Sequence, residues 1–188
     1  MFDKVDVRFI TGTVDCNTGK SVWFEKKELG KDFYPTIASC SIPVISKVVK
    51  IGDKELLDGG MTSPIPIHKS IEDGNDFHVV ISTRNKGYSK SPFKYLKAVK
   101  RIYGKKYPNL VTAIANRYKV YNEGVMLCEE LEKQGKGIVI RPETPLEVER
   151  FNKSAKKLLK LYDEGYENGK KAIVTIKKKL EEMNKNEI

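Results

Sequence analysis

The feature that most constrains the fold of this chain is a short apolar run, Leu56-Leu57, that ends in Asp58-Gly59-Gly60. The run predicts a β-strand whose exit places the Asp58 carboxylate at the strand tip. Glycines at the next two positions would let the backbone turn away with φ > 0 and let other backbone approach closely. We therefore expect a fixed, partly desolvated carboxylate that can act as a base, which is one half of a hydrolytic site.

The other half of such a site, a nucleophile, is not found in the 188 residues. No G-x-S-x-G nucleophile elbow is present, and the nearest string, residues 87–91, lacks the second glycine. Ser39 and Ser41 lie in a small-residue segment that favours close helix packing, and Ser63 could at most cap a turn. Cys40 would need a nearby cation or helix N-terminus to lower the pKa of its thiol. We assign no nucleophile to this chain.

Apolar periodicity predicts the elements around this motif. Two hairpins are expected, at residues 5–24 and 48–57, and a strand buried on both faces is expected at 77–82. Short helices are expected at 34–40 and before residue 71, several helices follow residue 92, and residues 137–142 form a strand. A long helix is predicted over 151–183, with a stripe of core residues: Leu158, Tyr162, Tyr166, Ile173, Ile176 and Leu180.

Strands mixed with helices indicate an α/β sandwich in which helices cover a mostly parallel sheet. Such a sheet normally opens with strand–helix units, whereas this chain opens with a hairpin, so we expect its first units to be missing. We expect residues 1–91 to form a partial α/β core that carries the Asp-Gly-Gly motif. Residues 92–188 form a helical part packed on that core.

Composition excludes several classes of protein. The net charge of +10 invites a nucleic-acid interpretation, but the lysine runs alternate with apolar residues at helical spacing, as on the outer faces of packed helices. We expect no nucleic-acid partner and at most a weak attraction to anionic lipid. Cys16, Cys40 and Cys128 are odd in number and widely spaced, which predicts reduced apolar thiols, and His68 and His78 show no ligand spacing. We expect no metal, no cofactor and a cytoplasmic protein.

Several motifs, in order along the chain, resemble those of bacterial patatin-like phospholipases. They are residues 14–20 (Val-Asp-Cys-Asn-Thr-Gly-Lys), 38–43 (Ala-Ser-Cys-Ser-Ile-Pro), the Asp-Gly-Gly sequence, 79–84 (Val-Val-Ile-Ser-Thr-Arg), Gly87-Tyr88 with Lys90 and Pro92, and 161–166 (Leu-Tyr-Asp-Glu-Gly-Tyr). The resemblance implies a three-layer sandwich and a serine acyl hydrolase that works with a Ser-Asp dyad. It makes Asp58 the dyad base, with Gly59 and Gly60 supporting the turn.

The resemblance covers the C-terminal portion of that family, so the nucleophilic serine and the oxyanion loop would come from a missing N-terminal segment. We expect the chain alone to be inactive, and the substrate of the completed site to be a lipid or acyl ester. The alternative is a non-catalytic binding or regulatory module that keeps the fold without its chemistry.

Overall fold

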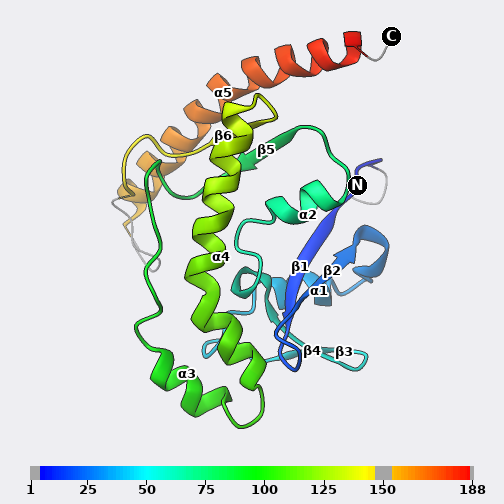
Figure 1. Ribbon diagram of the computed structural model, residues 1–188, viewed down its shortest axis with the longest axis vertical. Coiled ribbons are helices and arrows are strands. Elements are labelled where there is room, and N and C mark those ends of the chain that lie inside the picture. The colour runs from blue at the N-terminus through cyan, green and yellow to red at the C-terminus, as the bar shows by residue number, and fades with distance from the viewer. Residues whose placement is uncertain (1–4, 147–153, 187–188) are drawn as a thin grey trace. The chain divides into compact units, whose positions relative to one another are not determined.

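The computed structural model describes residues 5–146 and 154–186 of the chain (Figure 1). Its first half contains β1 (Ile10–Asp15), β2 (Ser21–Glu25), the 3-10 turn η2 (Lys26–Glu28), α1 (Tyr34–Ser39), β3 (Val49–Ile51), β4 (Lys54–Asp58), the 3-10 turn η3 (Gly59–Met61), α2 (Ile67–Glu72) and β5 (His78–Ile81). The second half contains α3 (Leu96–Tyr103), α4 (Pro108–Lys133), β6 (Gly137–Ile140) and α5 (Ala155–Asn186).

Both predicted hairpins are present and pair into one four-stranded sheet in the order β2-β1-β4-β3. The second hairpin turns at Gly52-Asp53, where Gly52 has φ of 58°, as a two-residue hairpin requires. The first hairpin begins later than predicted, at Ile10, and its turn is tightened by a hydrogen bond from the Asp15 N–H to the Lys20 carbonyl at 2.9 Å. β1 and β4 then pair antiparallel, with Val14 opposite Leu57.

The expectation of a mostly parallel, patatin-like three-layer sandwich is therefore wrong. Every pairing in the four-stranded sheet is antiparallel, and only β5 and β6 run parallel, as a separate pair. The physical reason is the length of the connections. Strands joined by a tight turn must run antiparallel, whereas a parallel pair needs a long crossover, which here runs from β5 through α3 and α4 to β6.

The chain forms two compact units, each assembled from two stretches. Unit 1 comprises residues 1–66 and 90–124, and unit 2 comprises residues 67–89 and 125–188. The predicted division at residue 91 stays a prediction.

Unit 1 holds its sheet between two apolar clusters. Leu56 and Leu57 are neighbours on β4 and point to opposite faces, as successive residues of a strand do. Leu57 joins a cluster with residues of α3 and of the first half of α4, including Leu110, while Leu56 joins Ala38 of α1. Leu56, Leu57, Ala38 and Leu110 are all fully buried.

Unit 2 has a smaller core. β5 and β6 pair from His78 opposite Gly137 to Ile81 opposite Ile140. The expectation that β5 is buried on both faces is wrong, because Ile81 is 79% exposed. Arg141, which follows β6, pairs with Glu129 and Glu132 of α4, and its carbonyl accepts a hydrogen bond from the Asn168 side chain of α5.

The long C-terminal helix exists, but its apolar stripe is not core. α5 begins at Ala155; the predicted start at Phe151 lies outside the described residues, and α5 continues unbroken through Gly165 and Gly169 (Figure 1). Five of the six predicted core residues are exposed by 44–66%: Leu158, Tyr162, Tyr166, Ile173 and Leu180. The stripe was predicted from helical spacing, which identifies an apolar face and does not show what covers it.

Candidate functional site

Asp58 occupies the end of β4, as predicted, and its carboxylate is fixed by the turn that follows. The backbone N–H of Asp58 donates to the Ser41 carbonyl at 2.9 Å, which anchors the strand end to the segment after α1. The Gly60 N–H donates to Oδ1 of Asp58 at 2.7 Å, so the side chain caps η3. Asp58 is half-buried. This arrangement is that of an N-cap aspartate, which accepts an otherwise unsatisfied N–H at the start of a helical turn.

The two glycines serve close approach and not a left-handed turn. Neither Gly59 nor Gly60 has a positive φ, so that part of the prediction is wrong: the backbone continues into a right-handed 3-10 turn. A Cβ on Gly59 would lie 2.3 Å from the Gly12 carbonyl oxygen of β1. A Cβ on Gly60 would lie 3.0 Å from Oδ1 of Asp58 and 3.7 Å from Nη2 of Arg117. The predicted close approach of other backbone is confirmed at Gly59.

Arg117 of α4 completes this turn and was not predicted. Its Nε donates a hydrogen bond to the Gly60 carbonyl. Gly60 is therefore bonded on both sides, because its own N–H donates to the Asp58 carboxylate. Arg117 is half-buried. The sequence offered a weak signal, an arginine one position before Tyr118 of the predicted helical stripe, but nothing in the sequence showed that this helix meets the Asp-Gly-Gly turn.

The Ser41 and Thr62 hydroxyl groups near this turn are hydrogen-bonded to groups other than Asp58. Ser41 Oγ donates to the Ile37 carbonyl at 2.8 Å and is buried. Thr62 Oγ1 bonds with Ser21 Oγ at 2.7 Å, and the Ser63 N–H donates to the Gly59 carbonyl at 2.8 Å. Within residues 5–146 and 154–186, no hydroxyl is hydrogen-bonded to Asp58, and Oδ2 of Asp58 has no hydrogen-bond partner. The turn thus presents one carboxylate oxygen without a local nucleophile.

The motif at residues 14–20 is a structural turn beside this site. Asp15, which is buried, accepts hydrogen bonds from the Asn17 N–H and the Thr18 hydroxyl at 3.1 and 2.9 Å. The Asn109 side chain of α4 donates to the Asn17 carbonyl at 2.8 Å. Gly19 has φ of 67°, and a Cβ there would lie 2.6 Å from the Asn109 carbonyl oxygen. The motif therefore joins the first hairpin to the start of α4.

Two groups in or next to the 14–20 turn, Cys16 and Glu55, have shifted pKa values. Burial, together with the Asp15 and Glu55 carboxylates, raises the pKa of the Cys16 thiol to about 12. Lys106 donates a hydrogen bond to Glu55 at 2.8 Å and holds the pKa of that carboxyl below its ordinary value. In unit 2, burial raises the pKa of the Cys128 thiol. Cys16 and Cys128 are buried reduced thiols, as predicted, whereas Cys40 is exposed.

Other predicted groups are placed without forming a metal centre. His78 opens β5, is buried, and its Nδ1 lies 2.9 Å from Ser70 Oγ. Across the part of the chain that the structure describes, no group of His, Cys, Asp and Glu side chains could hold a metal ion. None of the described helices combines the length and the apolar character that crossing a bilayer requires.

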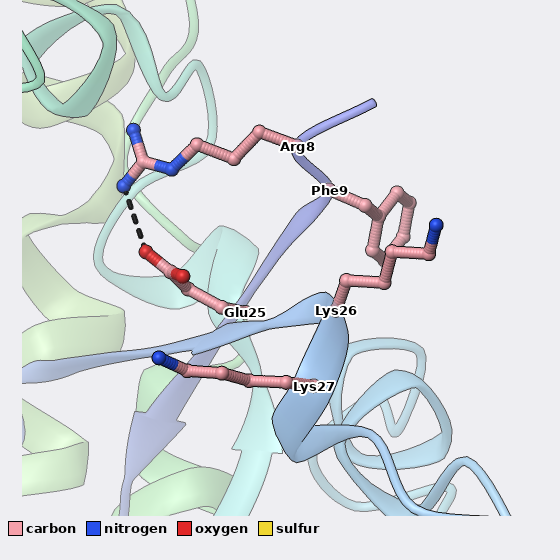
Figure 2. A pocket seen from close by; sticks show the side chains of 5 residues that line it. All are labelled: Arg8, Phe9, Glu25, Lys26 and Lys27. Carbon is pink, nitrogen blue, oxygen red and sulfur yellow. Dashed lines mark hydrogen bonds and ion pairs between the residues drawn. The ribbon is translucent and has the colours of Figure 1, made fainter. Parts of the chain in front are cut away.

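A hollow of about 380 Å³ lies on unit 1 and does not include Asp58 in its lining. It is lined by Arg8, Phe9, Glu25, Lys26 and Lys27 (Figure 2). Arg8 and Glu25 form an ion pair at 2.9 Å, and Lys26 donates to the Val5 carbonyl at 2.6 Å. Arg8 and Lys26 therefore join the segment before β1 to the end of β2 and the residue that follows it.

Comparison with known proteins corrects the resemblance stated above. The family model that matches the chain is DUF6363, a domain of unknown function, over residues 107–181, and no patatin model matches. No curated protein matches the chain. The matched residues run from the start of α4 into α5 and leave out the Asp-Gly-Gly turn. The identification as a patatin-like phospholipase is therefore wrong.

Proposed function

We propose that Asp58 is the proton acceptor of a carboxylic ester hydrolase that acts on lipid acyl esters, with the nucleophilic hydroxyl supplied by polypeptide outside these 188 residues. The observation that carries this proposal is the state of the Asp58 carboxylate. One oxygen is fixed by the Gly60 N–H at 2.7 Å, and the other has no hydrogen-bond partner among the described residues. A carboxylate that is already oriented needs little reorganisation to accept a proton.

Arg117 is a positioning residue in this proposal. It holds the Gly60 carbonyl, and the Gly60 N–H in turn holds Asp58. Gly59 packs directly against the β1 backbone at Gly12, which fixes the position of the turn.

The proposed reaction follows from these groups. A serine hydroxyl brought to Oδ2 gives its proton to Asp58 while its oxygen attacks the ester carbonyl. When the tetrahedral adduct collapses, the alcohol leaves with that proton and an acyl-serine remains. Water then attacks the acyl group, again giving a proton to Asp58, and the returning serine oxygen recovers it as the acid is released.

The substrate class and location belong to the same proposal. A net charge of +10 favours weak association with an anionic lipid surface, where acyl esters are presented. Three unpaired cysteines fit a reducing compartment, and we place the protein in the cytoplasm.

The test requires the hydroxyl-bearing segment. DNA directly upstream of the Met1 codon is sequenced, and, where it encodes an in-frame G-x-S-x-G, the longer product is assayed on a short-chain nitrophenyl ester. Asp58→Asn should lower the rate of hydrolysis about a hundredfold or more. The amide oxygen of Asn can still accept the Gly60 N–H, but the amide cannot act as a base. The control is Asp53→Asn, since Asp53 is 92% exposed in the β3–β4 turn.

Two results would overturn the proposal. One is an unrelated gene or a stop codon upstream of Met1. The other is a longer product that is inactive or that keeps its activity after Asp58→Asn. Robust hydrolysis by the 188 residues alone, lost in Asp58→Asn, would show instead that the nucleophile lies within this chain.

A non-catalytic binding or regulatory module is the second candidate function. It is favoured by the capping bond itself, since an N-cap role accounts for the Asp58 side chain without any reaction. Here Asp58→Asn should leave every property unchanged, whereas Asp58→Ala should lower the free energy of unfolding by about 1 kcal/mol.

A further inference from the structure

The exposed apolar face of α5 is a feature that neither candidate function uses. Five of its residues repeat at spacings of three, four, seven and seven and are exposed by 46–66%: Leu159, Tyr162, Tyr166, Ile173 and Leu180. We call these five residues the α5 stripe. Such spacing is the heptad pattern by which one helix packs along another.

Two aromatic side chains of the α5 stripe pack against each other on their own helix. The rings of Tyr162 and Tyr166 stack with centroids 6.2 Å apart and planes 12° from parallel. Lys170 lies over the Tyr166 ring at 4.6 Å and forms an ion pair with Glu167 at 2.8 Å. Pre-ordered aromatic side chains lose little conformational entropy on binding, which suits them to an interface.

We propose that the α5 stripe is a dimer interface in which α5 of one copy packs antiparallel against α5 of a second copy about a two-fold axis. In an antiparallel helix pair, the position numbers of facing core residues sum to a constant. When the numbers of two facing residues add up to 342, the two helices are centred on the middle of α5 (Ala155–Asn186) and overlap along almost their whole length.

Side-chain sizes are complementary in this alignment. Tyr162 faces Leu180 of the second copy, and Ile173 faces Gly169, which has open space around it. A parallel alignment would instead place Tyr162 against Tyr162 and leave Gly169 against Gly169, with a gap between the helices.

The charges beside the stripe are complementary as well. Asp163 and Lys177 are exposed, and neither has an ion-pair partner among the residues that the structure describes. The antiparallel alignment brings Asp163 of each copy beside Lys177 of the other, which gives two equivalent ion pairs. The two copies of Lys170 would lie near the two-fold axis. Each pairs with Glu167 of its own helix, which reduces the repulsion between the two ammonium groups.

A second copy suits this face better than a lipid surface does. Helices that lie on anionic membranes carry mainly Lys and Arg beside their apolar face. The N-terminal half of α5 carries Asp163 and Glu167 next to the tyrosines, as well as four lysines, and anionic lipid would repel these two carboxylates.

The test is sedimentation velocity of the full chain across a wide range of concentration. We expect a reversible dimer that Ile173→Lys weakens by about tenfold or more, because a charge would be buried in the helix seam. Val174→Lys is the matched control, since Val174 is adjacent, 69% exposed and off the stripe. Circular dichroism of both variants checks that α5 stays helical.

A charge exchange tests the orientation. Asp163→Lys and Lys177→Asp should each weaken the dimer by about two- to fivefold, and the combined variant should restore it. In a parallel pair the two positions lie fourteen residues, about 21 Å, apart, and the combined variant would restore nothing.

Three outcomes would overturn the proposal. The first is a chain that stays monomeric at every concentration. The second is a dimer that Ile173→Lys leaves intact. The third is a monomer that co-sediments with phosphatidylserine vesicles and loses this in Ile173→Lys, which would make the stripe a membrane-binding face.

Discussion

Unit 1 and unit 2 differ in how many of their apolar residues they bury. Both apolar clusters lie in unit 1, where the strands and helices bury residues such as Leu57 and Leu110 completely. Among the described residues of unit 2, only Ile67, Cys128 and Leu131 are buried apolar residues, and Ile81 and Tyr162 remain widely exposed.

The difference in buried apolar residues indicates how far each unit is stabilised by a core of its own. Unit 1 closes its own core, because its sheet is covered on both faces by helices of the same unit. Unit 2 has two strands, α2, the end of α4 and α5, and a parallel pair of strands is normally buried on both faces. In unit 2 part of the exposed apolar surface forms one face of α5, which the dimer proposed above would cover.

The largest expected effect comes from truncating one leucine in each unit. Leu110→Ala in α4 should lower the free energy of unfolding by about 2–5 kcal/mol, because the side chain is fully buried and leaves a cavity. Leu180→Ala in α5, where the side chain is 46% exposed, should change it by about 0.5 kcal/mol or less in the monomer. Urea unfolding at low protein concentration measures both. Equal losses would contradict the comparison.

A second test uses one glycine in each unit and predicts effects of opposite sign. Gly59→Ala should destabilise unit 1 by about 1–3 kcal/mol, since its Cβ would meet the Gly12 carbonyl oxygen at 2.3 Å. Gly165→Ala should stabilise α5 by about 0.5–1 kcal/mol, because nothing lies within 4 Å of its Cβ and alanine favours helix. Thermal unfolding decides the signs. A stabilising Gly59→Ala would mean that η3 and β1 are less closely packed than described.

A third test concerns the buried thiols at alkaline pH. Above the ordinary pKa of 9.0 the Cys16 thiol ionises in the unfolded chain, while the folded thiol stays protonated up to about 12. The free energy of unfolding should therefore fall as pH rises from 9 towards 12, by about 1 kcal/mol per pH unit from this group.

Substituting each buried thiol compares the two units. Cys16→Ala should flatten the alkaline decline, measured by urea unfolding at a series of pH values. Cys128→Ala should flatten it less, because after burial the largest influence on the pKa of Cys128 is Arg141, which lowers it, ahead of Glu132 and Glu129, which raise it. At Cys16 the largest influences after burial, Asp15 and Glu55, both raise the pKa, ahead of Lys106, which lowers it. An unchanged slope in Cys16→Ala would show that its thiol ionises freely in the folded chain.

Local patterns in the sequence predicted most of the elements. The Gly52-Asp53 turn, the helix that begins at Tyr34, the long helices and the carboxylate at the strand exit all depend on residues close together in the chain. Hairpin turns and helical periodicity are local properties, so the sequence displays them directly. Element ends were less accurate, as the late start of β1 shows.

The sheet arrangement and the site partners were not predictable in this way. The pairing of β1 with β4 and the bond from Arg117 to Gly60 join residues far apart in the chain. The parallel-sheet prediction failed because mixed strands and helices are compatible with both sheet types, and no local pattern distinguishes them.

The sequence by itself determined where strands, turns and helices form, and that Asp58 ends a strand next to two glycines. Only the tertiary structure decided that these glycines serve close backbone contact, that Asp58 caps the turn they form, and that the apolar face of α5 is exposed. The physical reason is that burial and hydrogen-bond partners depend on which distant segments meet, whereas backbone preference and periodicity are set residue by residue along the chain.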